Sequence, residues 1–399
     1  MGQKNGVLAL INGKIYAEQG TIQNGYLHIE SDKVVAMGEM SNFVHDPGNN
    51  VIDLEGRTVI PGMIDVHIHG VAGADVMDAV PEALDKMSVF LPREGTTGFL
   101  ATTITQSPDN IEKAVSNVAD YMENIQTAGK AECLGIHLEG PFVSARKKGA
   151  QPLEFIMEPN ISQFKQWQEA ARGKIKLVTL APEEPGGTEL ARYLRETGVV
   201  ASIGHSDATY DQVMEAIKAG VSHVTHLFNG MRGFHHREPG VAGAAMLSKA
   251  LNVEMILDGI HIDPRSVRLA YQQITSERIL LITDAMRAKC MNEGVYDLGG
   301  QQVTVTEQDA RLADGTLAGS ILKMKDAARN IRNFADCTME DIIKMTASNA
   351  AKELNIYDRK GSIAVGKDAD LVVLNQDFDI HMTFCRGKIA YQSATERNM

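Results

Sequence analysis

Cysteine is scarce in this sequence, and no two of its cysteines lie close together. The 399 residues contain four, Cys133, Cys290, Cys337 and Cys385, with no CxxC pair or zinc-knuckle spacing among them. This excludes a zinc site built on cysteine ligands and gives no sign of a disulfide framework. We therefore expect reduced thiols and a cytoplasmic protein.

Long apolar runs are also missing. No stretch approaches the roughly 18 apolar residues that a membrane-spanning helix needs, and residues 1–6 lack the apolar core of a signal peptide. The charge is one-sided as well, since 39 Lys and Arg stand against 51 Asp and Glu, for a net charge of −12. A chain this acidic is a poor ligand for nucleic acid or an anionic membrane, so we expect neither as a partner.

The glycine-rich loops that bind nucleotide phosphates are absent too. Neither GxGxxG nor GxxxxGK[ST] occurs, which argues against a doubly wound open sheet. What is present is a series of apolar, β-branched runs, with helical patterns between most of them. The runs cover residues 63–69, 98–104, 132–138, 175–181, 199–204, 222–227, 253–259 and 279–283. Eight buried strands that alternate with helices predict an α/β fold, a (β/α)8 TIM barrel.

The two ends of the chain follow a different pattern. Residues 7–60 and 369–391 hold short, alternating apolar segments between turn signals such as Asn12-Gly13, which is typical of antiparallel strands. Chain ends that lie close together can complete one domain around an inserted one. We predict a small β-sandwich domain from residues 1–61 and 363–399, and a metal-dependent catalytic barrel from residues 62–362.

Side chains that can bind metals follow the predicted barrel strands. In such a barrel the chemistry takes place at the carboxyl ends of the strands. His67 and His69 end the first strand, and because side chains alternate along a strand, both point to the same face. Later strands end in further imidazoles and carboxylates, namely Glu139, His205, His226 and Asp284.

Each of these residues alone has a commonplace interpretation. A lone HxH pair is weak evidence for a metal, a buried Glu139 more often pairs with Arg or Lys, and His205 or His226 is more often a hydrogen-bonded core residue. Their joint placement favours a site, because structural charges have no reason to collect at one barrel face. Imidazole and carboxylate ligands suit a divalent metal, and we expect one or two ions per subunit, zinc or iron.

A metal site of this kind indicates hydrolysis. A bound divalent ion makes water lose a proton near neutral pH. Asp284, at the end of the last strand, is the natural base for that water and the acid for a leaving amine. Its alternative role is that of a plain metal ligand. The expected reaction is hydrolysis of an amide or a similar bond.

Several longer motifs carry a resemblance to a known family. They are PGMIDVHIHG at 61–70, HLEGPF at 137–142, THLFNGM at 225–231, TDAM at 283–286 and LADGTLAGS at 312–320. In this order they resemble the amidohydrolase superfamily and, within it, the deacetylases of 6-phosphorylated N-acetyl amino sugars. The similarity runs nearly from end to end.

The resemblance implies a division of the metal ligands. His205, His226 and Glu139 would hold the main metal. His67 and His69 would help to hold a second one, and the presence of both favours a two-metal site.

The resemblance also implies how a substrate binds. Asp284 matches the general acid and base of the family. The resemblance also implies a homodimer, in which Arg237 or His261 can act across the interface between the subunits. The residues that match contacts to the phosphorylated sugar are Ala150, Asn229, Gly230, Arg237, His261, Leu317 and His137. An acidic protein that binds phosphate needs a local group of positive donors, and the loop 235–237, His-His-Arg, supplies one.

The implied reaction removes the acetyl group from N-acetyl-D-glucosamine 6-phosphate and yields D-glucosamine 6-phosphate and acetate. One alternative keeps the enzyme class and changes the substrate to N-acetylgalactosamine 6-phosphate or another acylamino sugar or acylamino acid. A second alternative is a metal-free scaffold barrel. Lost ligands would indicate a scaffold, and none of the six positions is missing.

Overall fold

The computed structural model describes residues 6–394. The outermost parts of the predicted small domain, residues 1–5 and 395–399, lie outside the described residues. The domain bounds at 61/62 and 362/363 stay a prediction. Within 6–394, no helix combines the length and the apolar character that crossing a bilayer requires.

The larger part of the molecule is the predicted barrel. Its eight parallel strands are hydrogen-bonded in the order β15-β14-β13-β12-β11-β10-β9-β6. A bridge between Ile68 and Ala285 joins the end of β6 to the segment after β15. The strands are β6 (Met63–Ile68), β9 (Thr96–Thr103), β10 (Glu132–Glu139), β11 (Ile175–Leu180), β12 (Val200–Ile203), β13 (Val221–Val224), β14 (Asn252–Ile256) and β15 (Ile279–Ile282). Each lies within or beside one of the eight apolar runs, so this prediction is confirmed.

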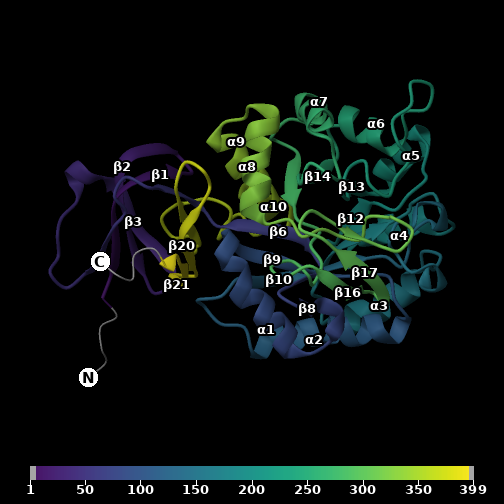
Figure 1. The fold of residues 1–399 in the computed structure, drawn as a ribbon, viewed down its shortest axis with the longest axis horizontal. Helices are drawn as coiled ribbons and strands as arrows, with labels where there is room; N and C mark the ends of the chain where they lie inside the picture. The colour runs from purple at the N-terminus through teal and green to yellow at the C-terminus, as the bar shows by residue number, and fades with distance from the viewer. Residues whose placement is uncertain (1–5, 395–399) are drawn as a thin grey trace.

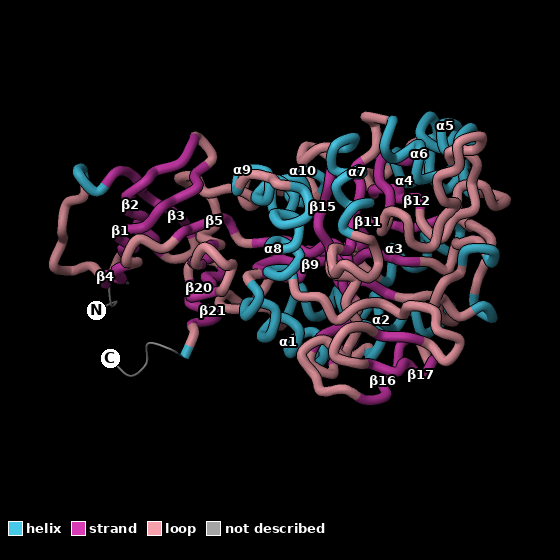
Figure 2. The backbone as a smooth tube through the Cα atoms, turned by 45° about the horizontal axis from the view of Figure 1, so that its top comes forward, coloured by secondary structure: helices cyan, strands magenta, loops and turns pink. Residues whose placement is uncertain are grey.

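Helices cover the outside of the barrel, as Figure 2 shows. One follows each strand, as strands buried on both faces require. The helices are α1 (Pro81–Phe90), α2 (Pro108–Asn124), α3 (Ile161–Ala170), α4 (Gly187–Glu196), α5 (Tyr210–Ala219), α6 (Gly240–Leu247), α7 (Pro264–Ile274) and α8 (Met324–Ala335), and α9 (Met339–Ile343) and α10 (Asn349–Glu353) follow them. The small hairpin of β7 (Gly70–Val71) and β8 (Ala74–Asp75) stands between β6 and α1.

The two chain ends form a second sheet beside the barrel (Figure 1). Its order is β21-β20-β19-β5-β1-β2-β3, with β4 paired to β1. Residues from both ends, among them Leu27 and Phe384, share an apolar core separate from that of the barrel. The strands are β1 (Leu8–Ala17), β2 (Gly20–Glu30), β3 (Lys33–Glu39), β4 (Asn50–Asp53), β5 (Thr58–Pro61), β19 (Leu371–Leu374), β20 (Ile380–Cys385) and β21 (Lys388–Gln392). The prediction of a small β-domain from both ends is confirmed.

One predicted turn of this domain was wrong. Asn12-Gly13 does not separate two strands but forms a bulge inside β1, where the pairing with β2 shifts register. Asn12 adopts a left-handed backbone with φ of 58°, which Asn tolerates better than most residues. The extra residue of a bulge is absorbed there and the strand continues.

A three-stranded sheet follows β15 and lies against one mouth of the barrel. It consists of β16 (Gly294–Leu298), β17 (Gln301–Val305) and β18 (Ala310–Arg311). Its inner side packs with Ile104, from the loop after β9, and with Met286, from the loop after β15. This packing places Arg311 and the following segment, residues 312–320, beside the carboxyl ends of the barrel strands.

Candidate active site

The predicted metal ligands lie at the point where the barrel closes. The backbone N–H of Asp284 donates to the carbonyl of His67 at 2.8 Å, and that of His69 donates to Ala285 at 2.9 Å. These bonds join the end of β6 to the residues after β15. Closure of the sheet therefore fixes the first histidine pair and the last aspartate relative to each other.

Three of the predicted ligands have a strained backbone. The φ angles of His205, His226 and Asp284 are 47°, 31° and 47°, a left-handed conformation that costs a non-glycine residue about 1–3 kcal/mol. Each of these residues is the second one after the end of a barrel strand. The strained turns aim the three side chains inward, and such strain concentrates at functional sites.

Glu139, His205 and His226 form the tightest group of the site. Oε1 of Glu139 lies 3.2 Å from Nε2 of His205 and 3.2 Å from Nε2 of His226. The two Nε2 atoms are also 3.2 Å apart. Three donor atoms at these separations can share one small cation, and the three residues form one of the groups able to hold a metal ion.

The other ring nitrogens determine which tautomers these histidines adopt. Nδ1 of His205 lies 2.9 Å from the carbonyl oxygen of Lys147, and Nδ1 of His226 lies 3.0 Å from that of Asn229. Because a carbonyl oxygen only accepts, Nδ1 must carry the proton in both rings. In the neutral rings each Nε2 therefore directs a lone pair at Glu139, as metal ligation requires.

His67, His69 and Asp284 complete a second group that shares Glu139. Nε2 of His67 lies 3.5 Å from both Oε1 of Glu139 and Oδ1 of Asp284. Nε2 of His69 lies 3.4 Å from Oε2 of Glu139 and 3.2 Å from Oδ1 of Asp284. Oε1 of Glu139 thus lies near His205, His226 and His67, and its Oε2 lies near His69. His67, His69 and Glu139 again satisfy the spacing of metal ligands.

The electrostatics of the two groups favour a positive charge at their centre. Burial alone would lower the pKa of His67, but the charges of Asp284 and Glu139 outweigh it and hold the pKa well above its ordinary value. Burial alone would raise the pKa of Glu139, yet the facing His67 and His205 hold it well below its ordinary value. Burial acts on Asp284 in the same direction, and His67 and His69 lower its pKa overall. Asp284 is therefore ionised near neutral pH and able to accept a proton.

An unpaired buried nitrogen also indicates that these residues fit a divalent cation. Among the described side chains, Nε2 of His67 is a buried nitrogen without a hydrogen-bond partner, although two carboxylates face it. A buried polar atom left unpaired costs free energy, and ligation of a cation removes that cost. Imidazole nitrogens together with carboxylate oxygens suit zinc, iron and manganese alike.

A cavity of about 370 Å³ opens onto this cluster, within the usual size range of small-molecule sites. Its wall includes His69, Glu139, His205, His226 and Asp284. The structure also brings five of the seven predicted substrate contacts to the same cavity, namely Ala150, Asn229, Gly230, His261 and Leu317.

Gly230 has a local reason to be glycine. Its φ is 56°, and a Cβ atom at this position would lie 2.8 Å from Nδ1 of His205. A larger side chain would therefore press on a ring that belongs to the cluster. The carbonyl oxygen of Gly230 also accepts from the backbone N–H of Ser206 at 3.0 Å.

Two predicted substrate contacts lie away from the cavity wall. His137 is fully buried beneath the cluster, where its nitrogens contact the carbonyl of Val66 at 3.2 Å and Oγ1 of Thr179 at 2.7 Å. Burial lowers its pKa to about 3, so the ring stays neutral. Both nitrogens are thus occupied below the site, and a sugar contact from His137 is not what this geometry favours. Arg237 stands on an exposed loop with Nη1 2.9 Å from His236.

Two polar residues of the cavity wall were not predicted from the sequence. Gln151 donates from Nε2 to Oε2 of Glu139 at 2.8 Å and accepts from the backbone of Thr105 at 2.9 Å, so it fixes the carboxylate that both groups share. Arg311 reaches the cavity from the added sheet, held by Asp309 at 2.7 Å. Only its place directly before the LADGTLAGS motif could have drawn attention to it.

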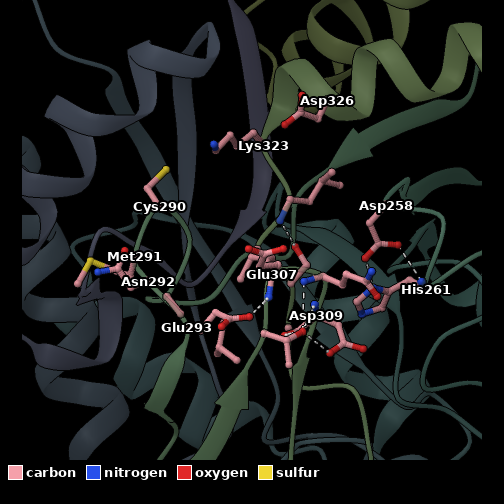
Figure 3. Close-up of a pocket in the computed structure, with 18 of the residues that line it drawn as sticks. Asp258, His261, Cys290, Met291, Asn292, Glu293, Glu307, Asp309, Lys323 and Asp326 are labelled. Atoms are coloured by element: carbon pink, nitrogen blue, oxygen red, sulfur yellow. Dashed lines mark hydrogen bonds and ion pairs between the residues drawn. The ribbon is translucent and has the colours of Figure 1, made fainter.

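A larger cavity of about 730 Å³ adjoins the first and shares His261 and Gly319 with it. Figure 3 shows Asp258 paired with His261 on one side and Cys290 on the other; the Asp258–His261 contact is 2.6 Å. Its wall contains five carboxylates and a single lysine, and none of the clustered metal ligands lines it. The smaller cavity is therefore the candidate active site, and Asp258 contacts the one histidine in the linings of both cavities.

Comparison with known proteins identifies relatives in one family. The profile of the Amidohydrolase family matches residues 58–390. The N-acetylglucosamine-6-phosphate deacetylase of Bacillus subtilis (strain 168) is 50% identical over 95% of this chain and 96% of its own length. The N-acetylgalactosamine-6-phosphate deacetylase of Escherichia coli O157:H7 is 35% identical over 94% of this chain and 97% of its own length.

A solved structure agrees with these sequence comparisons. It is a mutant N-acetyl-D-glucosamine-6-phosphate deacetylase from Mycobacterium smegmatis in complex with N-acetyl-D-glucosamine-6-phosphate. The TM-score is 0.90 at 32% identity, and the match covers 97% of this chain and 100% of that one. The resemblance predicted from the sequence motifs is confirmed. The chain belongs to the amidohydrolase family.

Proposed function

We propose that this protein is a metal-dependent hydrolase that removes the acetyl group from N-acetyl-D-glucosamine 6-phosphate, yielding D-glucosamine 6-phosphate and acetate. The observation that carries the proposal is the triangle of Glu139, His205 and His226 at the floor of a cavity of about 370 Å³, with Asp284 in the same wall. Relatives at 50% and 32% identity, whose names state this substrate, support the choice of reaction.

The residues of the cluster divide the work of amide hydrolysis. Glu139, His205 and His226 would hold one divalent metal, zinc or iron, and His67 with His69 would hold a second beside it. A divalent ion so bound supplies Lewis acidity, which acidifies water and polarises the amide carbonyl.

Asp284 moves the proton. Its carboxylate is ionised and lies 3.2 Å from Nε2 of His69. It takes a proton from the attacking water and returns it to the amide nitrogen as the C–N bond breaks, so that the sugar leaves as an amine and the acyl group as acetate.

The phosphate group needs positive donors, and the cavity offers few. Of the Lys and Arg residues that the structure describes, only Arg311 lines it, and His261 is the remaining basic group away from the metal cluster. Arg237 lies outside the cavity of its own chain, so we propose that it reaches the phosphate of a neighbouring subunit in a homodimer. Size measurement in solution tests whether the protein is a dimer. Mixing Arg237→Ala subunits with Asp284→Asn subunits tests the role of Arg237, because activity is restored in the mixed dimer only if the residue acts across subunits.

Arg311→Ala is expected to lower kcat/KM for the phosphorylated sugar about 10- to 100-fold, because a hydrogen bond to a charged group contributes about 1.5–3 kcal/mol. Turnover of unphosphorylated N-acetylglucosamine is the internal control, and it should stay unchanged. Steady-state kinetics on both sugars makes the comparison. An equal loss on both would show that Arg311 supports the cavity wall and does not read the phosphate.

The configuration at C4 of the sugar is the open point of substrate choice. A relative at 35% identity is named for N-acetylgalactosamine 6-phosphate, so this epimer is the second candidate. We expect acetate release from N-acetylglucosamine 6-phosphate to be the faster of the two, in line with the relative at 50% identity. Faster release from the galactose epimer would reverse the assignment.

A cytoplasmic location belongs to the same proposal. All four cysteines lie within the described residues and are free thiols there, and two of them, Cys133 and Cys385, are buried. Reduced cysteines are the ordinary state in the cytoplasm, and fractionation of cells that produce the protein is the direct test.

A further inference from the structure

One buried carboxylate touches ligands of both proposed metal positions. Glu254, in the middle of β14, is fully buried inside the barrel. Its Oε2 lies 3.0 Å from Nδ1 of His67 and accepts from the backbone N–H of His226 at 3.2 Å. Its own backbone carbonyl accepts from the N–H of Leu227 at 2.9 Å. Glu139 faces the Nε2 atoms of the same two histidines, whereas Glu254 contacts His67 at Nδ1 and His226 at its backbone.

The second oxygen of Glu254 is also occupied. Oε1 lies 3.2 Å from Nε2 of His223, whose Nδ1 lies 3.2 Å from Oε1 of Glu353. Glu353, at the end of α10, is in turn bound by the side-chain amide of Asn252. The carboxylate is therefore held at a fixed place by a chain of side chains that crosses the barrel away from the cluster. A hydrogen-bonded carboxylate in this position is rigid enough to orient a ligand.

We propose that Glu254 is the positioning residue that prepares His67 for a metal. This inference rests on the proposed metal-dependent function. Because an ionised carboxylate only accepts hydrogen bonds, Glu254 requires the proton of His67 on Nδ1. In the neutral ring, which is the form that binds a metal, Nε2 then points its lone pair toward Glu139 and Asp284, 3.5 Å away from each.

His67 differs from His205 and His226 in depending on a side chain for its tautomer. His205 and His226 are oriented by the backbone carbonyls of Lys147 and Asn229, which no substitution removes. The proposal therefore predicts different effects at the two metal positions. Loss of Glu254 weakens the metal position that contains His67 and, through the longer contact to the His226 backbone, affects the other position less.

The test measures metal binding and does not need turnover. Glu254→Gln keeps the shape of the side chain, Glu254→Asp keeps its charge but withdraws the oxygens, and Glu353→Gln is the matched control at the far end of the same chain. Metal content per subunit and competition with a chromogenic chelator are measured for Zn²⁺, alongside the thermal unfolding midpoint. For both Glu254 variants we expect one of two zinc equivalents to bind about 10- to 100-fold more weakly, the usual effect of losing such a partner. Glu353→Gln should bind both equivalents within about threefold of the unmodified protein, since it contacts no proposed ligand.

Three results would overturn the inference. The first is a Glu254 variant that folds and binds two equivalents as the unmodified protein does. The second is an equal loss in Glu353→Gln, which would make the effect a general one of buried charge. The third is an unmodified protein that binds only one equivalent, because His67 would then have no metal to serve. Failure to release acetate would count against the proposed reaction only, because the metal-binding measurements do not depend on turnover.

Discussion

Asp284→Asn is expected to lower kcat for acetate release by about 10²- to 10⁴-fold, the range that a positioned proton-transfer group contributes. The amide has the shape of the carboxylate but cannot take a proton from water. The backbone of Asp284 is held by two hydrogen bonds. Its N–H donates to the carbonyl of His67, and its carbonyl accepts from the N–H of Ser320 at 2.7 Å. Neither bond involves the side chain, so the substitution should leave the backbone in place.

Metal content decides how a loss of activity in Asp284→Asn is interpreted. The variant should retain the metal held by Glu139, His205 and His226, because these three contact one another without help from Asp284. Asp326→Asn, in the wall of the adjoining cavity, is the control and should keep full activity. Near-normal turnover in Asp284→Asn with metal bound would refute the proton-transfer role.

Lys360→Met is expected to reduce the free energy of unfolding by about 3–5 kcal/mol, the cost of removing one partner from a buried ion pair. The ammonium group of Lys360 is almost fully buried where the barrel meets the small domain. It lies 2.8 Å from Glu132 of β10 and 3.3 Å from Asp368, and it also pairs with Asp370, which precedes β19. Without it, Asp370 loses its lysine partner, while Arg359 still pairs with Glu132 and Asp368 and Lys33 still pairs with Asp368.

Lys344→Met is the control for this stability prediction. Lys344 pairs with Glu277 on the surface, and an exposed pair contributes about 0–1 kcal/mol. Urea denaturation of both variants and of the unmodified protein, followed by circular dichroism, gives the comparison. Similar midpoints for the two variants would mean that the buried network does not hold the two parts of the molecule together.

The barrel and most of its site could be predicted because two simple rules apply. Strands buried on both faces are continuous apolar runs, so each one is visible without knowledge of its neighbours. Polar residues at their carboxyl ends must then meet, whatever their separation in sequence. His67 and Asp284 are far apart along the chain, yet closure of the barrel brings Nε2 and Oδ1 within 3.5 Å.

Side-chain contacts between residues far apart in the sequence could not be predicted, because they depend on how the chain folds in three dimensions. Glu254 lies inside an apolar run and meets His67, 187 residues away, only because the barrel interior is shared. Arg311 reaches the cavity through an added sheet, and no periodicity marks where that sheet folds back. His137 alternates onto the same side as Glu139 but sits one step deeper, where Val66 and Thr179 occupy its nitrogens.

The most direct test of the whole account is acetate release by the zinc- or iron-loaded protein. N-acetylglucosamine 6-phosphate and unphosphorylated N-acetylglucosamine are compared at equal concentration, with metal content measured on the same sample. The account predicts one acetate per sugar amine formed from the phosphorylated sugar and far slower release from the unphosphorylated one. No release from either sugar, with metal bound at the cluster, would contradict it.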